Sequence, residues 1–386
     1  MEDSFDELCL EHKLIILTSY PELDEEKEQK IIDILNQPID WKEILFQAVL
    51  HRTINLLYYH LKELNLVSAM HKELYKCMRN SFFVYQVRNQ LMYDELGKVA
   101  DALNKEEINY AVLKGVYLST HVYPCIQTRT FNDVDLLINL KDGNKISKIL
   151  ESLGFIQGDY DAVKDEIIPY NRSQKIYHKM ATHEMAPFHK KTGNPFLPVI
   201  QIDLNYTVLW KGDCPYDIET DELLERTQLV DISGHQVRTL STKDFLLQLM
   251  FHLYREATSI NVISISRDLQ LYKFIDIAMF VKRFEKELDW CDLVEYVKEQ
   301  KAEKVFYYVF HYINILYPEL IPQEVMERLD VKDKEYLDEY GLDMGKKYKW
   351  NIGFLKRLFK ESRMDDLDSD AYDKESIFYN QRNLLQ

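Results

Sequence analysis

The spacing of apolar residues separates the chain into two helical regions and a mixed centre. Between residues 31 and 103, apolar side chains recur three and four positions apart, as at Ile44 and Ala48, which is the spacing of amphipathic helices. The centre instead alternates short apolar runs with helical spacing, the order expected of an α/β unit. The predicted strands are 108–113, 134–139 and 155–157, and the predicted helices are 116–122 and 145–153.

Helical spacing returns after Ser241, which together with Asp244 has the form of a helix-capping box. Apolar stripes that begin at Phe245, Leu271 and Val305 predict three further helices. The whole pattern indicates an α+β fold in three parts. These are a helical N-terminal region at 1–104, a central α/β domain at 105–235 with an insertion of strands and loops at about 158–198, and a C-terminal helical domain with an acidic tail at 236–386.

Three acidic residues lie on predicted strands. Asp133 and Asp135 are two positions apart, so their side chains project from the same face while Val134 faces the core. Asp203 lies on the polar side of a second alternating segment, 199–206. Paired carboxylates can hold two Mg²⁺ ions roughly 3.5 to 4 Å apart, as in phosphoryl and nucleotidyl transfer. The alternatives are a turn or calcium loop for the first pair and a solvent-facing strand position for Asp203.

A Lys-Gly pair joins the first predicted strand to the following helix. Gly115 at this turn would let backbone N–H groups approach a phosphate closely, and the start of a helix favours anions. Lys114 or Arg129 would then neutralise a triphosphate. Taken alone, a Lys-Gly pair between a strand and a helix is common. Combined with the acidic strand that follows it, the pair indicates nucleotidyl transfer.

This ordered set resembles the uncharacterised nucleotidyltransferase family of the DNA polymerase β-like superfamily, whose members carry a Lys-Gly turn in place of the usual Gly-Ser. The resemblance covers most of the chain. Further segments that look like family blocks are 40–45, 48–57, 183–188, 202–206 and 274–278. One position departs from the pattern, because Asn205 stands where these sequences often have a histidine. A role of that histidine therefore does not transfer to this chain.

The resemblance implies a polymerase β-like mixed sheet with N-terminal and C-terminal helical regions, in which 105–235 is the catalytic domain. It also implies transfer of an NMP from an NTP, with ATP the expected nucleotide, to a hydroxyl-bearing small-molecule or protein acceptor. The metal ligands would be Asp133, Asp135 and Asp203, holding two Mg²⁺ ions with Mn²⁺ as an alternative. Asp203 would also activate the acceptor hydroxyl. His183 and Asp276 are further candidates for contact with the acceptor or the nucleotide.

Two other functions share these residues. The chain is alternatively a catalytically silent nucleotide-binding or partner-docking module, or a toxin-like enzyme that modifies a protein or tRNA. Retained carboxylates argue against a silent module. The acceptor, the preferred NTP and the oligomeric state are not encoded in any recognisable pattern.

Charge and composition limit which partners and which cellular location are expected. A net charge of −16 makes nucleic acid an unexpected partner, because affinity for a phosphate backbone depends on lysine and arginine. One basic stretch, 346–363, carries interleaved apolar residues and is either a packed helix with a solvated basic face or a surface for a membrane or partner. Five scattered cysteines, an acidic N-terminus and the lack of a long apolar run predict a cytoplasmic protein without a transmembrane segment.

Overall fold

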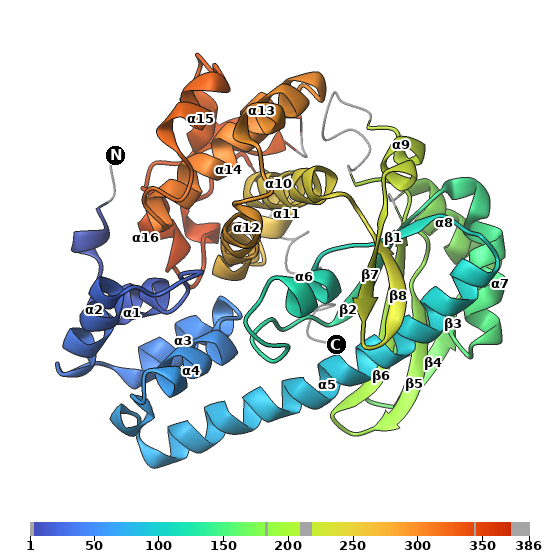
Figure 1. The fold of residues 1–386 in the computed structure, drawn as a ribbon, viewed down its shortest axis with the longest axis horizontal. Coiled ribbons are helices and arrows are strands. Elements are labelled where there is room, and N and C mark those ends of the chain that lie inside the picture. Colours follow the sequence, from blue (N-terminus) through green and yellow to red (C-terminus); the bar gives the residue numbers. More distant parts are fainter. Residues whose placement is uncertain (1–3, 182–183, 209–217, 343–344, 372–386) are drawn as a thin grey trace. The chain divides into compact units, whose positions relative to one another are not determined.

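The computed structural model describes residues 4–181, 184–208, 218–342 and 345–371 (Figure 1). The chain forms two compact units. The central unit is Asn80–Gln248, and the helical unit combines Met1–Arg79 with Leu249–Gln386. Both ends of the chain therefore belong to the same unit.

The central unit is built on a mixed eight-stranded sheet with the order β4-β3-β5-β6-β2-β1-β8-β7. Its strands are β1 (Tyr110–Val112), β2 (Asp133–Ile138), β3 (Ile156–Asp161), β4 (Glu166–Pro169), β5 (Phe188–Asn194), β6 (Leu197–Asn205), β7 (Gln228–Ile232) and β8 (His235–Thr239). The pairs β2–β6 and β1–β8 are parallel, and the other neighbours are antiparallel. The predicted α+β fold with a mixed sheet is thus confirmed.

Helices flank this sheet. They are most of α5 (Lys72–Lys105), α6 (Gly115–His121), α7 (Gly143–Ser152), α8 (Arg172–Ala181), α9 (Thr220–Glu225) and the start of α10 (Thr242–Thr258). The strands and helices predicted between 108 and 157 are present, with their ends displaced by at most four residues. The predicted content of the insertion at about 158–198 was incomplete, because it contains the helix α8 as well as strands.

The strand register defines two chemically different faces of the sheet. Residues paired across neighbouring strands share a face, and one such row consists of Val134, Ile202, Phe188 and Gln157. The first three are fully buried, so we call this the apolar face. The next row, which contains Asp133, belongs to the opposite face.

Helices α5 and α7 cover the apolar face. Lys190, which pairs with Ile200 on this face, reaches Glu95 of α5 at 2.7 Å. At the start of α7, a Cβ on Gly143 would lie 3.9 Å from Cδ1 of Ile138, another residue of the apolar face. The core of the central unit therefore lies between the sheet and these two helices.

The helical unit joins the predicted N-terminal and C-terminal helices. Its N-terminal helices are α1 (Leu10–Leu17), α2 (Glu25–Leu35), α3 (Trp41–Leu50) and α4 (Ile54–Glu63). Its later elements are the rest of α10, α11 (Ile260–Ile263), α12 (Leu271–Phe284), α13 (Trp290–Glu299), α14 (Glu303–Leu316), α15 (Gln323–Arg328), α16 (Phe354–Leu358) and the strand pair β9 (Glu339–Tyr340) and β10 (Tyr348–Lys349). Buried hydrogen bonds connect the two sets: the Ser19 and Tyr317 hydroxyls are 2.9 Å apart, and the Gln47 amide donates to the Phe359 carbonyl.

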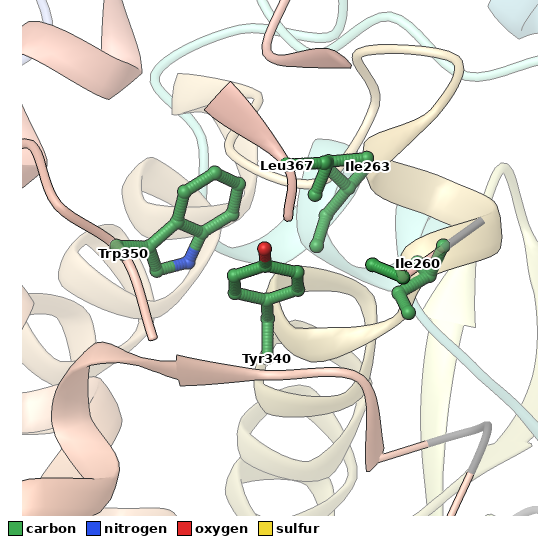
Figure 2. Close-up of a cluster of buried hydrophobic side chains, with 6 residues drawn as sticks. Ile260, Ile263, Tyr340, Trp350 and Leu367 are labelled. Atoms are coloured by element: carbon green, nitrogen blue, oxygen red, sulfur yellow. The ribbon is translucent and has the colours of Figure 1, made fainter. Parts of the chain in front are cut away.

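A cluster of buried apolar side chains joins α11 to the C-terminal segment of this unit (Figure 2). The rings of Tyr340 and Trp350 are 4.4 Å apart, and Ile260 and Leu367 belong to the same cluster. The Arg357 guanidinium lies 4.7 Å from the Trp350 ring and is fully buried. The basic stretch 346–363 is thus partly core.

A second arginine of this stretch is also internal. Arg363 is buried and pairs with the buried carboxylate of Asp268 at 2.7 Å. The expectation of a wholly solvated basic face is therefore wrong for both arginines. Within the ranges described, no helix combines the length and the apolar character needed to cross a bilayer.

Candidate active site

Strands β2 and β6 bring three carboxylates to the face of the sheet opposite the apolar face. Asp133 and Asp135 are half-buried on β2, where alternation places them on the same side. Strand β6 runs parallel to β2, and its register sets Asp203 directly beside Asp135. Asp203 is 8% exposed. The structure therefore groups the three acidic residues singled out in the sequence.

Burial and like charge disfavour ionisation of Asp203. Loss of water around this carboxyl, followed by the charges of Asp135 and Asp133, raises its pKa to about 8, and Glu184 adds to the effect. A hydrogen bond from Gln201 acts in the opposite direction. At neutral pH, without a bound cation, Asp203 therefore holds its proton for much of the time.

A residue that the sequence did not single out, Gln201, orients Asp203. The Gln201 amide donates to both carboxyl oxygens, at 3.0 and 2.9 Å, from the same face of β6. The Gln201 carbonyl oxygen lies 3.2 Å from Nε2 of His189, and Nδ1 of His189 donates to the Gly158 carbonyl at 2.8 Å. His189 is a buried residue of β5.

Lys114 adopts a backbone conformation that side chains rarely take. Its φ of 48° and ψ of −121° are those of a position that usually requires glycine. Such a conformation costs on the order of 1–3 kcal/mol in a residue with a side chain. The Lys114 ammonium group lies 3.4 Å from both carboxyl oxygens of Asp135. The strained turn thus places a cation beside the acidic pair.

Gly115 is needed for packing rather than for an unusual backbone angle. A Cβ at this position would lie 2.7 Å from Cβ of Phe131, which is too close for two carbon atoms. The glycine therefore lets α6 begin against the segment that precedes β2. Because α6 spans only Gly115–His121, a helix dipole contributes little here. Contact of Gly115 with a phosphate stays a prediction.

Arg129 is 6% exposed, and its guanidinium donates to the Thr130 carbonyl. The Asn89 amide donates a hydrogen bond to the Arg129 carbonyl at 3.1 Å. These contacts fix the segment that leads into β2. A role of Arg129 in neutralising a triphosphate stays a prediction.

Asn205 takes part in the acidic cluster. Its amide donates to Oδ1 of Asp135 at 3.2 Å, and the side chain is 4% exposed. An amide cannot lose or gain a proton near neutral pH, so Asn205 supplies a fixed donor to Asp135.

Two candidates from the sequence remain. His183 lies outside the described residues. Asp276 belongs to α12 of the helical unit and is 4% exposed. Their contacts with an acceptor or nucleotide stay predictions.

The donor set matches the chemistry of Mg²⁺, which prefers carboxylate oxygen. In the part of the chain that the structure describes, however, no three His, Cys, Asp or Glu side chains are arranged as a ready metal site. The oxygens of Asp203 accept from Gln201, while those of Asp135 face Lys114 and Asn205. The carboxylates of Asp135 and Asp203 would therefore have to turn away from these hydrogen-bond donors to bind a cation.

Comparison with known proteins identifies the family to which this chain belongs. A family model described as uncharacterised nucleotidyltransferase matches residues 37–318, which include the whole central unit. The chain therefore belongs to this nucleotidyltransferase family, as the resemblance of its motifs indicated. Among solved structures it is similar to an antigenic nucleotidyltransferase-like protein from Paracoccidioides brasiliensis, with 14% identity, a TM-score of 0.30, and coverage of 50% of this chain and 75% of that one. No curated protein matches the chain.

The raised pKa of Asp203 predicts an unusual pH dependence of stability. Below the pKa of an unfolded aspartate the group is protonated in both states, whereas between about pH 4 and about pH 8 only the folded state keeps the proton. The free energy of unfolding should therefore fall as pH rises through this window in metal-free buffer. Thermal melts in EDTA should show a smaller fall for Asp203→Asn, and parallel curves for the two proteins would contradict the assignment.

The strain at Lys114 predicts different stabilities for two substitutions. Lys114→Ala and Lys114→Gly both remove the ammonium group, but only glycine adopts the observed φ and ψ without strain. Urea unfolding should show Lys114→Gly to be more stable than Lys114→Ala by about 1 kcal/mol. The same two substitutions at Lys98, which lies within helix α5, are the control. At that position the alanine variant should be more stable than the glycine variant. Equal stabilities at position 114 would argue against backbone strain.

Proposed function

We propose that the protein transfers an NMP group from an NTP, with ATP the expected donor, to a hydroxyl group of a small-molecule or protein acceptor. The observation that carries this proposal is the parallel register that sets Asp203 beside Asp135, with Asp133 on the same face, in a nucleotidyltransferase family member. The acceptor oxygen attacks the α-phosphorus, the bond from this phosphorus to the bridging oxygen breaks, and pyrophosphate leaves.

The three carboxylates would hold two Mg²⁺ ions, or Mn²⁺ in their place, and these ions would offset phosphate charge and lower the pKa of the acceptor hydroxyl. The protein ligands would be oxygens of Asp133, Asp135 and Asp203. Cation binding competes with the proton that Asp203 carries in its absence, because a positive charge favours the ionised carboxyl.

Asp203 is suited to accept the proton of the acceptor hydroxyl. Bound cations would favour its ionised form, and an ionised carboxyl can take up the proton as the acceptor oxygen attacks. The two hydrogen bonds from Gln201 fix the plane of the Asp203 carboxyl group. Gln201 is a positioning residue in this proposal.

Lys114 is suited to neutralise the negative charge of the triphosphate. Its ammonium group lies beside Asp135 and is partly exposed, so it can turn towards an incoming phosphate. Arg129 and the Gly115 turn complete the proposed nucleotide contacts. Catalysis would then depend on positioning and electrostatics rather than on a covalent intermediate.

The proposal includes a cytoplasmic location, where ATP is present and thiols stay reduced. In agreement with this, the four cysteines within the described ranges are free thiols. The alternative of a catalytically silent module is less consistent with the site, because such a module has no need of three grouped carboxylates.

Loss of one carboxylate should abolish turnover. With α-labelled NTPs, Mg²⁺ and cell extract as the source of acceptor, Asp135→Asn should lower label transfer by about 100-fold or more, since a ligand to both ions is lost. Asp165→Asn is the matched control, because Asp165 is an exposed turn residue paired with Lys191. Unchanged transfer by Asp135→Asn would reject the proposal, and mass spectrometry of the labelled product would identify the acceptor.

Removal of the Gln201 amide should slow turnover and shift its pH dependence. Gln201→Leu should lower kcat by about 10-fold with little change in the KM for NTP, because the orientation of Asp203 is lost while the nucleotide contacts remain. The acidic limb of the kcat profile should move to higher pH, because the amide opposes the rise in the Asp203 pKa. Gln236→Leu, at an exposed position of β8, is the control. A pH profile identical to that of the unaltered protein would limit Gln201 to a structural role.

A further inference from the structure

The central unit contains a cavity of about 510 Å³ between α7 and α8. Asn144, Ser147, Lys148 and Glu151 face it from α7, and Arg172, Lys175, Ile176 and Lys179 face it from α8. Each set has the spacing of one helix face, three and four residues apart. Its remaining lining includes Gln157 of β3 and Tyr206, which directly follows β6.

The cavity is strongly basic. Four of its side chains, Lys148, Arg172, Lys175 and Lys179, are cationic, and Glu151 is its one acidic lining residue among those that the structure describes. These cations make no ion pair within the described ranges. A site of this kind is unexpected in a chain of net charge −16 unless an anion occupies it.

Other lysines of the same unit show the contrast. Lys145, one turn before Lys148 on α7, lies 3.1 Å from Glu106. Lys191 lies 2.6 Å from Asp165. Lysines outside the cavity thus form ion pairs with acidic side chains. The lysines that line the cavity form no such ion pair within the described ranges.

Tyr206 lines the cavity, but its hydroxyl is buried. The Tyr206 hydroxyl has no hydrogen-bond partner among the described residues, and burial raises the pKa of Tyr206 to about 12. It therefore keeps its proton at neutral pH, and because the hydroxyl oxygen is enclosed, Tyr206 contributes its ring rather than a hydrogen-bond donor to the cavity lining. The neighbouring Gln157 amide already donates to the Ala186 carbonyl at 2.9 Å.

The cavity is separate from the candidate active site. Gln157 pairs with Phe188 and so lies on the apolar face of the sheet, whereas Asp135 and Asp203 lie on the opposite face. A nucleotide bound at the three carboxylates would therefore not occupy this cavity. The two sites share β6, which carries Asp203 on one face and ends beside Tyr206.

We propose that this basic cavity binds a phosphorylated small molecule. Its volume is within the range of about 300–1,000 Å³ that is usual for small-molecule sites. Four cations against one carboxylate match a ligand with several negative charges, and the Arg172 guanidinium can bind two phosphate oxygens at once. The site is additional to the proposed nucleotide site, and its occupant is not the transferred nucleotide.

Calorimetry with inorganic pyrophosphate tests this site directly. The titration is done on the full chain in EDTA, so that binding through metal ions at the carboxylates is excluded. We expect saturable binding of one pyrophosphate, weakened at least about 10-fold in a Lys148→Ala/Lys175→Ala double variant, since two of four cations are lost. Lys145→Ala, which removes a paired lysine of the same helix, should bind as the unaltered protein does.

A second control separates the two sites. Asp203→Asn should leave pyrophosphate binding unchanged, even if it abolishes nucleotidyl transfer, so failure of the proposed function and failure of this inference are distinguishable. Circular dichroism would verify that each variant is folded. The inference is overturned by absence of saturable binding, by equal binding in the double variant and Lys145→Ala, or by loss of binding in Asp203→Asn. Binding of an RNA oligonucleotide without pyrophosphate binding would also overturn it.

Discussion

The parallel pairing of β2 with β6 is the constraint on which the rest of the central unit depends. It places Asp135 and Asp203 side by side, and the resulting repulsion and burial hold the Asp203 proton. The surrounding contacts then follow from the need to accommodate these carboxyls: an ammonium group from Lys114 and amide groups from Asn205 and Gln201. The same pairing turns the apolar residues of both strands towards α5 and α7. One face of this strand pair therefore contributes to the core that stabilises the unit, and the other face carries the carboxylates of the proposed chemistry.

Much of this arrangement could be predicted from local patterns. Alternation alone showed that Asp133 and Asp135 share a face and that Asp203 faces away from the core, because side-chain direction in a strand has a period of two. The helical stripes likewise predicted α10, α12 and α14. The family motifs then connected these elements to nucleotidyl transfer. What local patterns could predict was the direction of each side chain within its own element.

Contacts between distant segments could not be predicted in this way. The register of β2 on β6 joins residues about 70 positions apart, and no pattern within either strand specifies it. The role of Gln201 depends on that register. Helix α8 was missed for a different reason: Ile176, Tyr177 and Met180 remain exposed, so the segment lacks the buried stripe by which the other helices were recognised. The basic cavity was missed with it.

The interrupted helical unit has a consequence for synthesis of the chain on the ribosome. Its two parts are separated by the 80–248 segment, yet they pack into one core through contacts such as Ser19 with Tyr317. The first 79 residues must therefore wait for the last third of the chain, with apolar helix faces uncovered in the meantime. The central unit emerges complete before that happens, so vectorial folding should begin in the middle of the sequence. Chaperones that shield exposed apolar helices would accordingly be needed most by the segment that precedes the central unit.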